Sequence, residues 1–212
     1  MSRPYHLDLS SGPLGNALQV NWEDYNYPPL LKIIHFRLND VEESGARKAV
    51  FWAHVNLIAV CVALVLNVVG TAVLAGMGVR RKGVPVLYSI FNLILVSALG
   101  LYSFYHCYKG TATQNRRLCK RFYLSHSLMM VFMLLAAVLD VSSFNGWMGL
   151  WRAQASQEPL RNLWTWWTVL EASLWTANLV TGAAVIMQMK GHDGHEHIGP
   201  VCSPQELGEV RS

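Results

Sequence analysis

Four long apolar runs dominate this chain. They cover Phe51–Met77, Val84–Tyr105, Phe122–Val141 and Leu163–Met189, and each is 20 to 27 residues long and almost free of charge. About 20 helical residues span the hydrocarbon core of a bilayer. Only helices or closed barrels satisfy the backbone in lipid, and no run alternates with period two. The pattern therefore predicts an all-α membrane protein, a bundle of four transmembrane helices.

Polar segments flank and separate these runs. Residues 1–49 form the predicted N-terminal arm, residues 50–190 the membrane domain and residues 191–212 a tail. The loop from Ser142 to Asn162 is rich in aromatic residues, which predicts an interfacial amphipathic turn. Only 14% of all residues are charged, against about a quarter in soluble domains. The first fifty residues lack the pattern of a cleaved signal peptide, so we expect the first span to direct insertion.

Positive charges indicate how the chain threads the membrane. The segments before the first span, between the second and third, and after the last carry ten of the Lys and Arg residues that flank spans. The other two loops carry five. Since cytosolic loops are enriched in Lys and Arg, we expect both termini and the middle loop in the cytosol. The triplet Arg80–Lys82 opposes this, but two spans joined by so short a turn insert as a hairpin.

The middle loop, His106–Arg121, contains five bases and no acid. The bases are Lys109, Arg116, Arg117, Lys120 and Arg121. Each base near an anionic leaflet contributes about 1 kcal/mol to membrane binding. The five bases therefore predict that the loop contacts phosphatidylserine or phosphoinositide headgroups. The alternative is that these bases only set the topology. Cys107 and Cys119 lie beside the spans and are candidates for S-palmitoylation.

The last span contains two polar residues, Glu171 and Asn178, on one helical face. An ionisable residue within a span marks a candidate functional site. With Asp140 near the end of the third span, Glu171 suggests a small proton-coupled transporter. The alternative is a protonated Glu171 that is hydrogen-bonded inside the bundle to Asn67 or Asn92.

Histidines raise two further hypotheses. His54 and His126 lie at similar depth in different spans, which suggests a redox protein with a haem between them. The tail sequence HDGHEH, residues 192–197, suggests a weak metal site, but its glycine makes an ordered site improbable. We expect no metal, no cofactor and no catalytic residue, because phosphate-binding loops, HExxH and nucleophile elbows are missing from the sequence.

The arm contains an aromatic–proline block before the first span. Two prolines exclude a helix interior there. The residues expected to bind a partner are Tyr25, Tyr27, Pro28, Pro29 and Leu30. This block, the four close-set spans and a loop that opens with Phe104 and Tyr105 resemble the secretory carrier membrane proteins over residues 25–190.

The resemblance implies a non-enzymatic protein of post-Golgi vesicles that acts in vesicle-mediated protein transport. It implies cytosolic termini, residence in the trans-Golgi network, recycling endosomes, secretory vesicles or plasma membrane, and trafficking proteins as partners. Two features depart from the family pattern: the arm has no Asn-Pro-Phe repeat, and His106 and Cys107 replace an Arg-Pro pair in the loop. A homo-oligomer is possible, and no nucleic-acid partner is expected. A purely structural four-span scaffold is a third hypothesis.

Overall fold

The computed structural model describes residues 20–78, 83–141, 143–156 and 160–196. The chain contains two compact units, residues 1–40 and residues 41–212. Within the described residues, four helices of the second unit are long and apolar enough to cross a membrane. The predicted four-span helical membrane protein is therefore confirmed.

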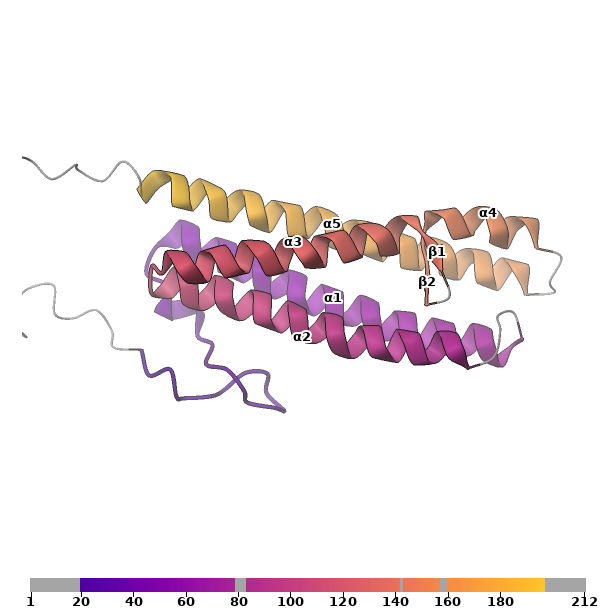
Figure 1. Cartoon of the computed structure of the whole chain (residues 1–212), viewed down its shortest axis with the longest axis horizontal. Helices are drawn as coiled ribbons and strands as arrows, with labels where there is room; N and C mark the ends of the chain where they lie inside the picture. Colours follow the sequence, from indigo (N-terminus) through magenta and orange to yellow (C-terminus); the bar gives the residue numbers. More distant parts are fainter. Residues whose placement is uncertain (1–19, 79–82, 142, 157–159, 197–212) are drawn as a thin grey trace, which may run out of the picture. The chain divides into compact units, whose positions relative to one another are not determined.

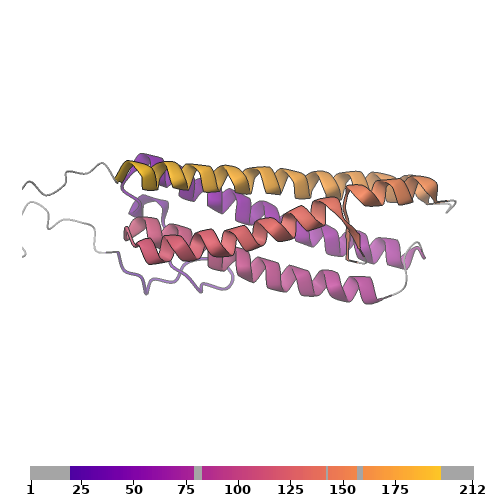
Figure 2. The same cartoon turned by 45° about the horizontal axis from the view of Figure 1, so that its top comes forward.

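The second unit is a bundle of long helices. Helices α1 (Ser44–Gly76), α2 (Val84–Ala112), α3 (Arg116–Val138) and α5 (Arg161–Glu196) run side by side (Figure 1, Figure 2). Helix α1 packs against α2 and α5, and α3 packs against the same two helices from the other side. The four helices thus form a closed ring in the order α1, α2, α3, α5.

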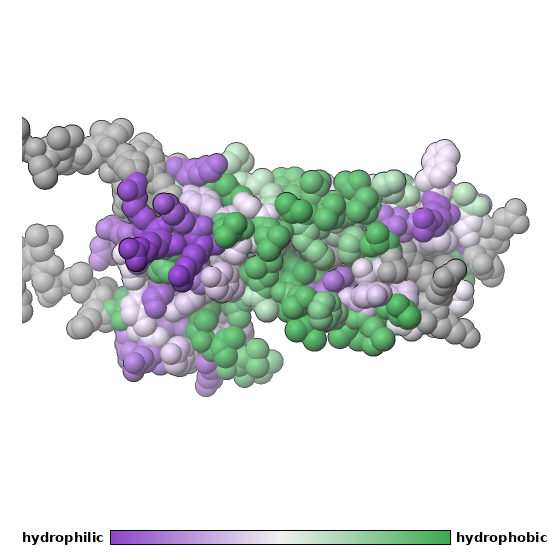
Figure 3. Space-filling view, viewed as in Figure 1, coloured by the Kyte–Doolittle hydropathy of each residue, from purple (hydrophilic) through white to green (hydrophobic). Residues whose placement is uncertain are grey.

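Apolar side chains fill the centre of the ring. The core contains both large and small side chains, and all four long helices contribute to it. It comprises Val60, Ala63, Leu64, Val96, Met129, Met133, Ala136, Ala137 and Trp175. On the face drawn in Figure 3, hydrophobic residues cover the middle of the bundle, whereas hydrophilic residues gather at the end where α2 turns into α3. An apolar outer surface of this kind suits lipid rather than water.

The ends of the helices differ from the predicted span limits. Helix α2 continues past Tyr105 to Ala112, and α3 begins at Arg116, before the predicted start at Phe122. The middle loop is therefore a tight turn of three residues between two helix ends. The turn is closed by Asn115, whose side chain accepts a hydrogen bond from the backbone N–H of Arg117. Asn is a favoured residue at this capping position.

The third predicted span is interrupted. Helix α3 ends at Val138, and the short strands β1 (Asp140–Val141) and β2 (Phe144–Asn145) form an antiparallel hairpin. Helix α4 (Trp147–Ala155) then continues along α5 (Figure 1). The predicted third span, 122–141, was therefore wrong at its end, because Leu139 adopts an extended conformation. Gly146 permits the turn, since a Cβ there would collide with the backbone of Val138 and Leu139.

The first unit contains a short folded segment. Tyr27 and Ile34 form an antiparallel bridge that closes a loop over residues 28–33, and the Tyr27–Pro28 peptide bond is cis. The segment ends in a 3₁₀ helix, η2 (Leu38–Asp40). As predicted, the proline block is not helical.

The close contact between α1 and α5 can be tested at Gly70 of α1. A Cβ at this position would overlap the indole ring of Trp167 on α5. We expect Gly70→Ala to lower the free energy of unfolding by about 1–3 kcal/mol, because overpacking forces neighbouring groups apart. Circular dichroism of the detergent-solubilised protein across an SDS titration measures this change.

Gly76→Ala is the matched control, because a Cβ at Gly76 of the same helix meets nothing within 4 Å. Both substitutions replace a helical glycine by a better helix former. Their difference therefore reports the contact with Trp167, and equal unfolding midpoints would contradict the close packing.

Candidate functional site

The carboxyl group of Glu171 lies buried at the centre of a polar cluster. It accepts hydrogen bonds from Asn67 Nδ2 at 2.6 Å and from Trp175 Nε1 at 3.4 Å. Asn145 donates to it twice, from the backbone N at 3.2 Å and from Nδ2 at 2.8 Å. In each of these four bonds the donor is a nitrogen. Such a set of donors suits an acceptor-only carboxylate.

The cluster holds the hairpin between α3 and α4 inside the bundle. The carbonyl oxygen of Ser143 accepts hydrogen bonds from Asn67 Nδ2 at 2.7 Å and from Ser89 Oγ at 3.0 Å. The Ser143 hydroxyl accepts one from Asn92 Nδ2 at 3.3 Å. Polar side chains of α1, α2 and α5 thereby satisfy a non-helical backbone among four spans, where water is scarce. The hairpin crosses from the end of α3 towards α1 and α2 (Figure 1).

These contacts decide between the hypotheses for Glu171. The predicted bond to Asn67 is present, whereas Asn92 contacts Ser143 instead. Asp140 is directed elsewhere: its carboxyl group lies 2.8 Å from Arg152 Nη1 of α4. The two acids are therefore not paired, as a shared proton site would require. This geometry favours a structural role for Glu171 over transport.

Asn178 belongs to a separate polar cluster nearer the α2–α3 end of the bundle. Its Nδ2 donates to the carbonyl oxygens of Leu174 at 3.0 Å and Ala59 at 3.5 Å. Asn56 of α1 donates in turn to the carbonyl oxygen of Asn178 at 3.1 Å and to Thr181 Oγ1 at 2.8 Å. The group joins α1 to α5. Asn56 and Asn145 were missed from the sequence, although Asn56 interrupts an apolar run and is a polar residue of the kind that joins helices in lipid.

The two histidines considered as haem ligands have other contacts. His126 Nδ1 lies 3.3 Å from Ser103 Oγ, and its Nε2 lies 3.2 Å from the carbonyl oxygen of Gly182. Both ring nitrogens are thus engaged within the protein. His54 is half-buried, with its ring centroid 5.2 Å from that of Phe104. This arrangement disfavours axial ligation by His126. The HDGHEH tail lies outside the residues whose side chains are described.

The five bases of the middle loop gather around the α2–α3 turn. Four of them occupy the first two turns of α3 and are exposed. These are Arg116, Arg117, Lys120 and Arg121. Lys109, on α2, is half-buried and differs from the rest, because its Nζ donates to Tyr105 Oη at 3.2 Å and lies 5.5 Å from the centre of that ring.

The two candidate cysteines differ in accessibility. Cys107 is fully buried, and its thiol contacts Met189 Sδ at 3.7 Å. Cys119 is half-buried on α3. Since an acyltransferase needs an accessible thiol, the packing disfavours Cys107. S-palmitoylation of Cys119 stays a prediction.

The arm exposes only part of the aromatic–proline block. Tyr25, Pro29 and Leu30 are exposed, whereas the half-buried Tyr27 packs edge-on against Phe36 with ring centroids 5.6 Å apart. The segment that the sequence singled out is therefore exposed at Tyr25, Pro29 and Leu30 and half-buried at Tyr27. Binding of a trafficking partner by this block stays a prediction.

Together, the four spans and the basic turn define a four-span integral membrane protein. The family model of the SCAMP family matches residues 24–195, which is most of the chain. The protein belongs to this family, the secretory carrier membrane proteins, and membership indicates a membrane-trafficking protein. Searches of curated proteins and of solved structures gave no match.

Whether the carboxyl group of Glu171 is ionised or protonated can be tested by Glu171→Gln. An amide would direct its NH₂ group at a neighbouring N–H donor, so we expect the free energy of unfolding to fall by about 1–3 kcal/mol. A protonated carboxylic acid that donated its own proton would instead be mimicked well by Gln. SDS unfolding monitored by circular dichroism measures the difference.

The control is the reverse exchange at the exposed Gln154 of α4, Gln154→Glu. It exchanges an amide and a carboxyl group where no buried hydrogen bonds depend on the choice. We expect it to leave the unfolding midpoint nearly unchanged, because surface substitutions are usually close to neutral. A Glu171→Gln protein as stable as the unmodified one would contradict the carboxylate assignment.

Proposed function

We propose that this protein acts in vesicle-mediated protein transport as a resident of post-Golgi membranes, and that its α2–α3 turn contacts anionic lipids. Membership of the SCAMP family carries the trafficking role. The four exposed bases at the start of α3 carry the lipid contact. In this proposal both chain termini and the turn face the cytosol.

The bases form one continuous patch on α3. Arg116 and Lys120 are four residues apart, as are Arg117 and Arg121. Residues at this spacing are neighbours on one side of a helix. Like charges at this spacing repel each other, and a bound anion would relieve that repulsion.

The position of the patch on the helix strengthens this preference for anions. The first turn of α3 contains no acidic residue. The N-terminus of a helix carries a partial positive charge, which stabilises nearby anions and destabilises nearby cations. A phosphate group therefore gains from the helix dipole as well as from the side chains.

The charge asymmetry between the two faces of the membrane supports the proposed orientation. The termini and the α2–α3 turn carry twice as many span-flanking bases as the opposite loops. Cytosolic leaflets are the anionic ones, so the orientation that the bases favour also presents the patch to its ligand.

The lipid contact can be tested with the full chain held in nanodiscs. We expect Arg116→Gln combined with Arg117→Gln to weaken binding to phosphoinositide-containing vesicles by about tenfold or more, since each base contributes about 1 kcal/mol. Extending the change to Lys120 and Arg121 should abolish binding. Co-sedimentation at several salt concentrations measures it.

The matched control is Lys48→Gln with Lys190→Gln, which removes two exposed bases outside the turn. Lys48 lies near the start of α1, and Lys190 lies near the end of α5. Equal losses for the two pairs would show a general charge effect and would contradict a specific lipid contact at the turn.

The compartment and topology require a cellular measurement. We expect a protein tagged at either end to co-localise with trans-Golgi, recycling endosome or secretory vesicle markers. Protease added to sealed vesicles from these cells should remove both tags, since both termini face the cytosol in this proposal. Protection of either tag would contradict the topology, and retention in the endoplasmic reticulum would contradict the site of action.

A further inference from the structure

The folded segment of the arm presents an apolar tip. The loop closed by Tyr27 and Ile34 exposes Leu30, Leu31 and Ile33 by 97%, 68% and 52%. Three large aliphatic side chains in one exposed loop form a patch that water solvates poorly. We propose that this tip, Leu30–Ile33, inserts into the bilayer leaflet at which α1 enters the membrane.

Hydrogen bonds fix the loop that carries the tip. Ile34 N donates to the carbonyl oxygen of Tyr27 at 2.9 Å, and Tyr27 N donates to that of Ile34 at 3.0 Å. Within the loop, Leu31 N and Lys32 N both donate to the carbonyl oxygen of Pro28. The aliphatic side chains are therefore presented by an ordered backbone. Pre-organisation lowers the entropic cost of insertion.

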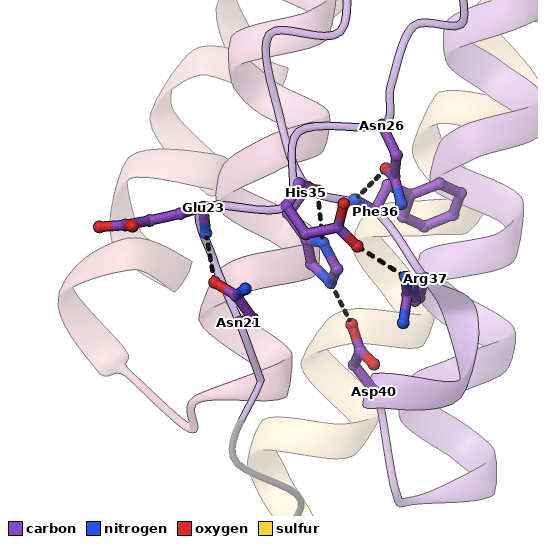
Figure 4. A network of polar contacts seen from close by, with 8 residues as sticks. Asn21, Glu23, Asn26, His35, Phe36, Arg37 and Asp40 are labelled. Carbon is purple, nitrogen blue, oxygen red and sulfur yellow. Dashed lines mark hydrogen bonds and ion pairs between the residues drawn. The ribbon is translucent and has the colours of Figure 1, made fainter.

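A second network holds the base of the segment (Figure 4). His35 bonds through Nδ1 to the carbonyl oxygen of Asp24 at 2.9 Å and through Nε2 to Asp40 Oδ2 at 2.8 Å. Arg37 Nη2 donates to Asp24 Oδ2 at 2.6 Å, and Asn26 Oδ1 accepts from Phe36 N at 2.9 Å. The folded base supports the loop independently of what the tip contacts.

Charge is distributed to suit a membrane. All three acids of residues 20–40 lie outside the loop, and two of them, Asp24 and Asp40, are engaged by Arg37 and His35. The tip itself contains one charged residue, Lys32. A lysine among aliphatic residues suits the lipid interface, because its stem lies in the apolar layer while the ammonium group stays at the headgroups.

The covalent connection to α1 also keeps the tip close to the bilayer. Only Val41, Glu42 and Glu43 separate Asp40 from the start of α1, which crosses the membrane. The chain from Leu31 to the start of α1 at Ser44 reaches at most about 45 Å even when fully extended. The tip is thus confined near the interface, and this confinement gives a high effective concentration of lipid. A free protein partner has no such advantage.

Insertion can be measured on the full chain in phosphatidylcholine nanodiscs. Leu30→Cys, in a chain whose four native cysteines are replaced by alanine, is labelled with the fluorophore NBD. We expect blue-shifted emission, quenching by lipid-borne doxyl groups and loss of quenching by iodide. An identical label at Glu23→Cys, exposed outside the loop, should show strong iodide quenching.

Leu31→Gln with Ile33→Gln should release the labelled tip, weakening insertion by about tenfold for each side chain removed from the apolar phase. Unchanged exchange protection of the Tyr27–Ile34 bridge shows that the loop still folds. Insertion into neutral lipid should persist at high salt, which separates it from the contact at the α2–α3 turn. Equal iodide quenching at both labels would overturn the proposal. Shielding of Leu30 only after cytosol is added would also overturn it, in favour of a protein partner.

Discussion

A backbone polar group among membrane spans must find its hydrogen-bond partner within the protein, and the bundle is organised around meeting this demand. The hairpin between α3 and α4 lacks helical hydrogen bonds. Side chains of Glu171, Asn67 and Ser89, on three different helices, supply hydrogen-bond partners for its backbone instead. Removing one partner would strand a buried polar group, which costs more than the net gain from the bond. These residues are therefore tied to the hairpin and to one another.

This interruption explains features that are otherwise unrelated. Because α3 ends early, α4 completes the path along α5, and Trp147 of α4 donates to Thr176 Oγ1 at 3.0 Å. Asp140, at the start of the hairpin, is left with a neighbour of opposite charge in Arg152. Elsewhere helices approach closely through small residues, as at Gly70 against Trp167, which is how spans associate in lipid.

The two ends of the bundle differ in their polar side chains. The hairpin end is joined by internal hydrogen bonds. The α2–α3 end carries the exposed basic patch, and α1 begins at this same end. Basic side chains and an aliphatic loop recognise different layers of a membrane, the headgroups and the acyl chains. Two modest contacts tethered together hold more strongly than either alone.

By itself, the sequence determined the class of fold, the number of spans and the presence of five bases between the second and third spans. Runs of twenty or more apolar residues have few other stable forms. The resemblance carried by the Asn26–Leu30 block also identified the family, which the model of residues 24–195 confirmed. Within the spans, a hydrogen bond from Glu171 to Asn67 or Asn92 was predicted because an acid in lipid needs a partner, and the structure shows the bond to Asn67.

Only the tertiary structure decided where the third span breaks and what each polar residue contacts. Hydropathy averages over a window and carries no signal for so short a hairpin, so the sequence indicated that Leu139 belongs to a helix. The role of Asn145 depends on residues more than twenty positions away, as does that of Asn56. Likewise, the sequence suggested partner binding by Leu30 and palmitoylation of Cys107 without indicating which side chain is accessible. Packing exposes the first and buries the second.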